Sequence, residues 1–292
     1  MRSLVISVFF MISCLFATQS FADEKVKTYK VVLNIDNTVF FHSHFGWKSV
    51  AVAFQHAKEL DSRLASKKPI FLVLDTGGGG ISAGLELIQN MRSLNRPVHT
   101  VTIFAASMGF QTVQGLNKRL ILKTGTLMAH KARGGFWGEF PGQLDARYEY
   151  WIKRVMAMDK IAVKRTKDVH TLDSYRNLIE NEFWCDGVDC ISQGFADALV
   201  NVRCDDTLAG SHVYTQWRFM WGGHAIEKRV TKSNCPLITG YLDYNYYIDG
   251  NPVFGVDSWN ALYSLPGDTK ELKRLIEEKS AEFGYRKVKK GY

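Results

Sequence analysis

The sequence is poor in proline and cysteine, and after residue 22 it contains no long apolar run. Six prolines in 292 residues exclude a collagen-like or proline-rich disordered chain. Five cysteines in a chain of this length exclude a small scaffold held together by disulfides. A membrane-spanning helix needs ~20 consecutive apolar residues, and no segment after residue 22 approaches that length. The 46% hydrophobic content is instead that of a globular protein with one large domain, or one domain and an appendage.

The charge balance also excludes a class of partner. Lys and Arg exceed Asp and Glu by 37 to 29, which gives a formal net charge of +8. No run of basic residues is interleaved with aromatic residues, so we expect no nucleic-acid partner. A solvated face accounts for an excess of this size.

The first 22 residues have the pattern of an export signal. Arg2 precedes an apolar stretch at 4–17, and Ser20 and Ala22 place small residues at the −3 and −1 positions of a cleavage site before Asp23. We therefore expect a cleaved signal peptide and a periplasmic or secreted protein. A retained anchor helix and a lipid attached to Cys14 are the alternatives.

Export changes the interpretation of the cysteines. Four remain after cleavage, and an even number in an oxidising compartment predicts two disulfides. Proximity in the sequence favours one pair at Cys185 and Cys190 and the other at Cys204 and Cys235. A zinc site is the rival interpretation, but there is no CxxC pair, and the close histidines His42 and His44 lie far away in the sequence. We expect no metal.

Strands and helices alternate through residues 23–203. Apolar runs at 30–35, 70–74 and 98–105 predict buried strands, and two short strands are expected at 120–122 and 127–129, on either side of a turn. Helical periodicity marks 47–64, 83–94 and a long amphipathic stretch at 144–165. This alternation predicts an α/β core with a largely parallel sheet.

Residues 204–292 differ in character and form a C-terminal extension. They are rich in Tyr, Trp and Asn, with weak helical periodicity until Asp268. Asp268 can cap a last helix that ends at Gly284. We expect the extension to pack on the core, and its aromatic residues to cover a sheet more readily than to bind a ligand: Trp217, Trp221, Tyr244, Tyr246, Tyr247 and Trp259.

Four successive glycines, at 77–80, follow the strand at 70–74. They formally fit a dinucleotide-binding loop, but the acidic residue expected about 20 positions later is missing, since no Asp or Glu occurs between Glu86 and Glu139. Four glycines also exceed what a turn needs. Backbone without side chains suits the close approach of a substrate or an oxyanion.

This loop is one of three motifs that together resemble a known family. The segment Asp-Thr-Gly-Gly-Gly-Gly-Ile-Ser-Ala-Gly at 75–84 is similar to the glycine loop of the Clp-protease proteolytic subunit. Ala-Ala-Ser-Met-Gly at 105–109 is similar to its nucleophile motif, and Leu-Met-Ala-His at 127–130 to its histidine motif. The resemblance covers about residues 30–200. It implies a crotonase-like, Clp-type spiral of ββα units, followed here by the C-terminal extension.

The resemblance also implies acyl-transfer chemistry. Ser107 would be the nucleophile, activated by His130 as the general base that later protonates the leaving amine. The backbone N–H groups of Gly79 and Met108 would form the oxyanion hole by their positions in the motifs. A serine–lysine dyad with Lys131 or Lys118 is an alternative, as in signal-peptide peptidases of the same fold.

The third member of the triad departs from the family. The family has Asp where this chain has Asn181, which can orient an imidazole but cannot stabilise imidazolium by charge. Glu180, Glu182 and Asp173 are alternative orienting residues. An enoyl-CoA hydratase would need acidic residues near the glycine loops, where only Glu86 is available.

Two functions follow from these residues. The first is an exported serine peptidase that cleaves short or unfolded peptides, needs no cofactor, forms a homo-oligomer through 144–165 and has no ATP-dependent unfoldase partner. The second is a non-catalytic scaffold or binding protein on the same fold, suggested by Asn181 and by the large extension.

Overall fold

The computed structural model describes residues 26–63, 68–219, 225–253 and residue 274. The expected signal peptide lies outside the described residues, and so does the helix predicted at 268–284 except for residue 274. Within them, no helix combines the length and the apolar character that crossing a bilayer requires.

The core is built on a sheet that is parallel except at one strand. Its order in the described residues is β1-β7-β5-β4-β3-β2, with β6 paired antiparallel to β5. The strands are β1 (Thr28–Leu33), β2 (Thr38–Phe41), β3 (Ile70–Thr76), β4 (Val98–Ala106), β5 (Arg119–Ala129), β6 (Phe183–Asp186) and β7 (Ala198–Cys204). The expected α/β class with a largely parallel sheet is confirmed.

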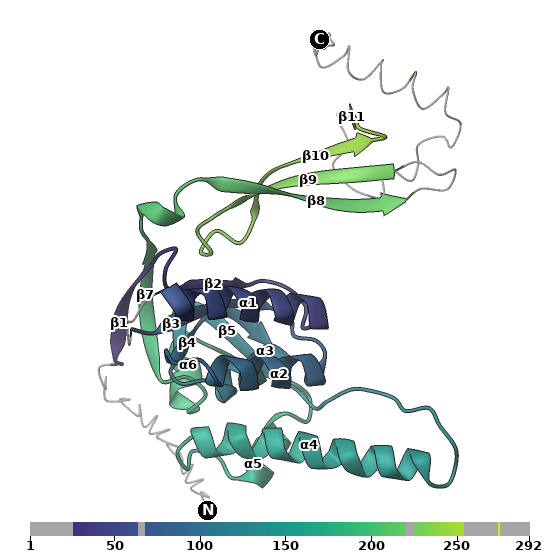
Figure 1. The fold of residues 1–292 in the computed structure, drawn as a ribbon. Helices are drawn as coiled ribbons and strands as arrows, with labels where there is room; N and C mark the ends of the chain where they lie inside the picture. Colours follow the sequence, from purple (N-terminus) through teal and green to yellow (C-terminus); the bar gives the residue numbers. More distant parts are fainter. Residues whose placement is uncertain (1–25, 64–67, 220–224, 254–273, 275–292) are drawn as a thin grey trace, which may run out of the picture.

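Helices cover one face of this sheet (Figure 1). They are α1 (Trp47–Arg63), α2 (Ile81–Arg92), α3 (Met108–Gly115), α4 (Gln143–Arg165), α5 (Leu172–Leu178) and α6 (Gly187–Ser192). Alternate residues of a strand point to opposite faces, so in β3 Ile70, Leu72 and Leu74 join the cluster under the helices while Val73 joins a smaller cluster on the other face. The predicted apolar stripe of α1 lies on the sheet, with Val50, Ala57 and Leu60 fully buried.

The segment that leads to the histidine motif is one strand and not two. β5 runs without interruption from Arg119 to Ala129, and its pairing with β4 shifts register between Thr102 and Phe104. A Cβ on Gly125 would lie 2.5 Å from the carbonyl oxygen of Thr102, so glycine lets β5 pass close to β4 where a turn was expected. The exposed polar residues before Gly125 resemble a turn in sequence, and the irregular pairing accommodates them.

The extension forms a second, antiparallel sheet. It contains β8 (Ser211–Phe219), β9 (Ala225–Ser233), β10 (Tyr241–Ile248) and β11 (Asn251–Val253), and a short 3₁₀ turn, η1 (Asp206–Leu208), precedes it. The helical periodicity of this segment is weak because it forms strands, and burial alternates in the second half of both β9 and β10. On one face, the Lys228 ammonium lies over the rings of Tyr241, Tyr244 and Tyr246 at 4.5–5.3 Å.

Both predicted disulfides are present. Cys185 and Cys190 link β6 to α6 with their Cα atoms 5.1 Å apart. Cys204 and Cys235 link the end of β7 to the segment after β9, with a Cα separation of 5.9 Å. The second bond therefore ties the extension to the core, and Leu237 beside it packs against the open face of the core sheet.

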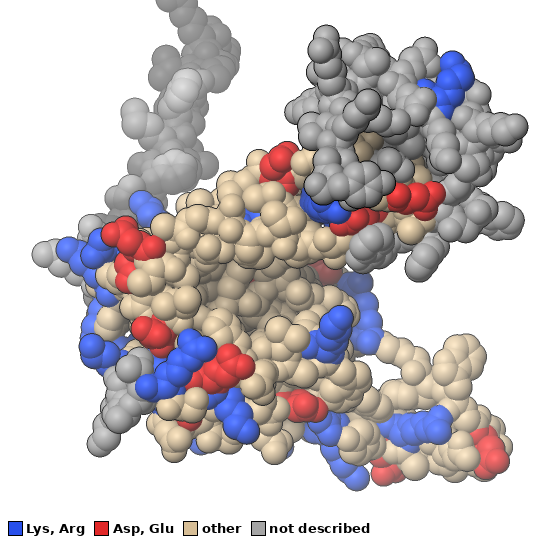
Figure 2. Space-filling model, turned by 45° about the horizontal axis from the view of Figure 1, so that its top comes forward, with Lys and Arg blue, Asp and Glu red and all other residues tan. Residues whose placement is uncertain are grey.

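Charges of both signs are interspersed on the visible surface. Figure 2 shows Lys and Arg alternating with Asp and Glu around an uncharged area between the core and the extension. This face carries no broad patch of one sign.

Candidate active site

Ser107 lies at the corner between β4 and α3. Its φ of 56° and ψ of −116° fall in a region that favours glycine, at a cost of about 1–3 kcal/mol for other residues. Its amide N–H donates to the Met128 carbonyl oxygen on β5 over 2.8 Å. The sharp corner places the hydroxyl at the end of the strand, where Ser107 lines a cleft.

His130 directly follows β5 and reaches Ser107. Its Nε2 atom lies 2.8 Å from Ser107 Oγ. The two residues meet because β4 and β5 are parallel neighbours, with Ala106 opposite Met128, so both chains leave the sheet at the same edge. The separation is within hydrogen-bond range, as proton transfer from a serine to a general base requires.

The glycine loop lies against Ser107 at its second glycine. A Cβ on Gly78 would be 2.6 Å from Ser107 Cβ and 3.0 Å from the Met108 amide nitrogen, and its φ is +98°. Only glycine fits this approach. The sequence motif indicated the loop, but nothing in it singled out Gly78 as the contact with the serine.

Among the described residues, the N–H groups of Gly79 and Met108, beside this contact, have no acceptor. A short parallel bridge joins Gly79 to Phe45, using the Phe45 N–H to Gly78 oxygen and the Gly80 N–H to Phe45 oxygen at 2.9 and 2.8 Å. The bridge leaves the N–H of Gly79 free. Met108 is the first residue of α3, so its N–H has no acceptor within the helix. Both groups are suited to binding an oxyanion.

No carboxylate completes the site. His130 Nδ1 is enclosed by the protein and has no hydrogen-bond partner within the described residues. Asn181 lines a second cavity of about 320 Å³ beside His130, but no hydrogen bond joins the two side chains. The structure therefore brings Asn181 near the histidine without making it an orienting group.

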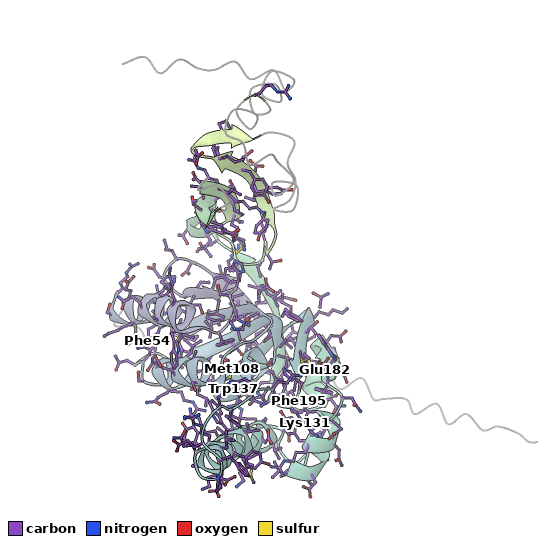
Figure 3. The ribbon with its side chains drawn as sticks, turned by 90° about the vertical axis from the view of Figure 1, so that its right-hand side faces the viewer. Phe54, Met108, Lys131, Trp137, Glu182 and Phe195 are labelled. Carbon is purple, nitrogen blue, oxygen red and sulfur yellow. A yellow bond between two sulfur atoms is a disulfide. The ribbon has the colours of Figure 1, made fainter. Side chains whose placement is uncertain are left out.

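Two of the alternative acids, Glu180 and Glu182, line the same cavity beside His130, but each is paired with a basic side chain. Glu180 forms an ion pair with Lys131, and Glu182 Oε1 lies 3.1 Å from Arg133 Nη2. Figure 3 labels Lys131 and Glu182, which lie in the same part of the core. Asp173 is exposed in the first turn of α5 and lines neither cavity.

Neither lysine of the alternative dyad replaces the histidine. Lys131 is paired with Glu180, and Lys118 Nζ donates to the Tyr29 hydroxyl over 3.0 Å. Of the bases considered, His130 is the one hydrogen-bonded to Ser107 Oγ.

A cleft of about 520 Å³ opens beside Ser107 and His130. Most of its lining is apolar, contributed by α4, by the residue after α5 and by the residues that follow the serine and the glycine loop: Ile81, Met108, Ile152, Val155, Met156 and Ile179. Asp159 and Arg176 also line it, and sequence analysis did not identify either. The available signal was the position of Asp159 on the apolar face of α4, between Val155 and Ala162.

Comparison with known proteins agrees with this geometry. A family model, Clp protease, matches residues 22–203. The chain belongs to the Clp protease family. The ATP-dependent Clp protease proteolytic subunit of Streptococcus uberis is 28% identical over 138 residues, covering 46% of this chain and 69% of that protein. The subunit of the same name from Streptococcus agalactiae is 26% identical over 137 residues, with the same coverage.

The Clp protease subunit of Streptococcus gordonii is similar to the same degree, at 27% identity over 140 residues. Clp protease membership supports a serine peptidase at the level of the family, and it confirms the resemblance seen in the three motifs. The matched region ends at residue 203, where the antiparallel extension begins.

Proposed function

We propose that this protein is an exported serine peptidase in which Ser107 and His130 work as a pair without a charged third member. The observation that carries the proposal is the 2.8 Å separation of Ser107 Oγ and His130 Nε2, beside the backbone N–H groups of Gly79 and Met108. Ser107 Oγ attacks the scissile carbonyl carbon as its proton passes to His130 Nε2. The oxyanion accepts hydrogen bonds from the N–H groups of Gly79 and Met108.

The second half of the reaction reverses these roles. His130 returns the proton to the leaving amine as the C–N bond breaks, which leaves an acyl-serine. Water then attacks that ester with His130 again as base, releasing the acid and free Ser107. Without a carboxylate beside His130 Nδ1, the imidazolium form of His130 is stabilised less than in a complete triad. Replacing Asp by Asn in a serine-protease triad lowers kcat about 10⁴-fold, so we expect slow turnover.

We further propose that the peptidase is a homo-oligomer that acts on short or unfolded peptides without an ATPase. The relatives are named subunits of an ATP-dependent protease, whereas the signal-like residues 1–22 favour a compartment without ATP. Exposed apolar side chains on α4 and the loop before it favour self-association, with Trp137 88% and Phe140 80% exposed. Sedimentation velocity at micromolar concentration tests this, and a strict monomer would contradict it.

A fluorophosphonate probe tests the catalytic proposal directly. Covalent labelling is expected in the mature protein, and both Ser107→Ala and His130→Ala should abolish it. Labelling that persists in Ser107→Ala, or absence of labelling in the intact oligomer, would overturn the proposal.

A non-catalytic scaffold is the second candidate. The enclosed, unpartnered Nδ1 of His130 favours it, because a histidine without an orienting acceptor is a weakened base. It predicts normal assembly with no labelling.

A further inference from the structure

Two charged side chains, Asp159 and Arg176, line the cleft beside Ser107, whose lining is otherwise mostly apolar. Asp159 on α4 is only 6% exposed and lines the cleft together with Arg176 from α5. Arg176 Nε lies 3.4 Å from Asp159 Oδ2, which makes this a long, single contact. A carboxylate this deeply buried ordinarily accepts several hydrogen bonds.

The other carboxylate oxygen has no donor. Among the described residues no group donates to Asp159 Oδ1, and, unlike His130 Nδ1, this atom is not enclosed by the protein. Burial raises the pKa of Asp159, and the hydrogen bond and charge of Arg176 oppose this only in part. The cleft therefore presents an acceptor for which the described part of the chain supplies no donor.

The charges near this acceptor decide which donor fits. Arg176 already balances the charge of Asp159, and Lys131 at the rim is paired with Glu180. A substrate cation would lose its water without finding an excess negative charge, and a substrate carboxylate would face Asp159. A purely apolar side chain would displace water from Oδ1 and leave that oxygen without a partner. A neutral donor on an apolar body avoids all three costs.

We propose that Asp159 and Arg176 make the enzyme selective for such a side chain at P1, the residue whose carbonyl Ser107 attacks, with tyrosine foremost. The tyrosine ring lies between the apolar walls, and its hydroxyl donates to Asp159 Oδ1. The oxygen of that tyrosine hydroxyl accepts a hydrogen bond from the guanidinium of Arg176. This selectivity rests on the proposed peptidase function, since the cleft is assigned to P1 because Ser107 and His130 line it.

Binding to a variant that cannot turn over tests the selectivity apart from catalysis. In full-length Ser107→Ala protein, isothermal titration compares N-acetyl-Ala-Ala-Tyr amide with its Phe counterpart, which differs by one hydroxyl. We expect the Tyr peptide to bind about tenfold more tightly, the effect of one hydrogen bond to a charged group. The counterparts that end in Lys and Leu are titrated in the same way. Equal dissociation constants for the Tyr and Phe peptides, or tighter binding of the Lys or Leu peptide than of the Tyr peptide, would overturn the proposal.

Variants of Asp159 show whether this residue is responsible for the preference for the Tyr peptide. Adding Asp159→Leu should bring the ratio close to one, whereas Asp159→Asn, which keeps an acceptor oxygen, should retain part of it. Glu149→Gln changes an exposed carboxylate on the same helix and should leave the ratio unchanged. An unchanged ratio in Asp159→Leu would show that other groups select the side chain.

The outcome is separable from that of the labelling experiment. A protein that labels with fluorophosphonate but does not distinguish Tyr from Phe keeps the peptidase function and loses this selectivity. A protein that distinguishes the peptides without labelling keeps the subsite and loses the peptidase function.

Discussion

Ser107 holds a backbone conformation that costs the folded protein stability. A glycine at this position would relieve the strain of a positive φ, whereas alanine would keep it. We therefore expect Ser107→Gly to melt at a higher temperature than Ser107→Ala, by an amount equivalent to about 1 kcal/mol. Calorimetry of the two inactive variants measures this. Equal melting temperatures would show that the corner is not strained.

Asn181 is the residue at which the site departs from a complete triad. Asn181→Asp should introduce a carboxylate near the unpartnered Nδ1 of His130 and raise the rate of fluorophosphonate labelling at least about tenfold. Asn181→Ala should change the rate little, because Asn181 makes no hydrogen bond to His130. Initial labelling rates at fixed probe concentration are the measurement. A large loss in Asn181→Ala would show that the amide orients the imidazole during catalysis.

The sequence predicted which residues meet at the site better than it predicted how they are partnered. Ser107 and His130 come together because each follows a strand, and neighbouring parallel strands end at one edge. The hydrogen bonding of Asn181, Glu180 and Glu182 depends on the conformation of a short loop. A shift of one residue along this loop would change the partner of each side chain. The role of Gly78 depends on a contact between segments distant in the sequence, which no local pattern records, and Asp159 was marked only by its position on the apolar face of α4.

At the scale of elements, a buried ion pair joins α3, β5 and the segment before β7. Arg119 is 2% exposed, and its Nη2 lies 2.6 Å from Asp197 Oδ1 while Nη1 donates to Gln114 and to the Gly194 carbonyl. Burial raises the pKa of Asp197, but the hydrogen bonds and charge of Arg119 outweigh burial and hold that pKa below its usual value.

Removing Arg119 should therefore destabilise the core. Arg119→Met leaves the Asp197 carboxylate partly buried, with the backbone N–H of residue 119 and the more distant Arg165 as its partners. We expect a loss of about 3–5 kcal/mol in the free energy of unfolding at pH 7. Urea denaturation measures it. The Glu149→Gln variant, which breaks an exposed pair on α4, should unfold like the unaltered protein.

The same pair predicts a dependence on pH. Because the pKa of Asp197 is lowered in the folded state, its contribution to stability is full above the unfolded value of about 4 and is lost as the pH falls through the lower folded value. Urea midpoints of the unaltered protein should drop below pH 4 more steeply than those of Arg119→Met. If the urea midpoints of the two proteins fall in parallel as the pH drops, other carboxylates cause the acid sensitivity.

Elements with clear periodicity were predicted well, and those with mixed patterns were not. The apolar residues of α1 repeat with the period of a helix, and β3 contains the continuous apolar run of a buried strand. Both elements lie within two residues of the expected bounds. β5 was divided in two because its exposed Lys123 and Thr124 precede a glycine. The extension was obscured because Lys228 and Lys232 alternate with apolar residues on one face of β9, their charges placed over tyrosine rings.

At the scale of the whole molecule, Cys204–Cys235 holds the extension to the core. The bond closes a sequence separation of 31 residues, which corresponds to about 3–4 kcal/mol of loop entropy in the unfolded chain. Replacing both cysteines by serine should lower the unfolding midpoint and speed proteolytic removal of the extension, with the core left intact. Limited trypsin digestion followed by mass spectrometry checks this. The Cys185/Cys190 double serine variant is the comparison, since it should leave the extension protected.

The hydrogen bond from the Ser107 amide to Met128 has a consequence for the time scale of the site. It ties the backbone of the nucleophile to the strand that ends directly before His130, so the backbones of the serine and the histidine cannot separate without breaking this bond between neighbouring strands. Amide deuterium exchange at Ser107 should then be as slow as in the middle of β4, and much slower than in the exposed loop before α4. The backbone positions of Ser107 and His130 would therefore persist for as long as the sheet stays closed, independently of motion in the surrounding loops.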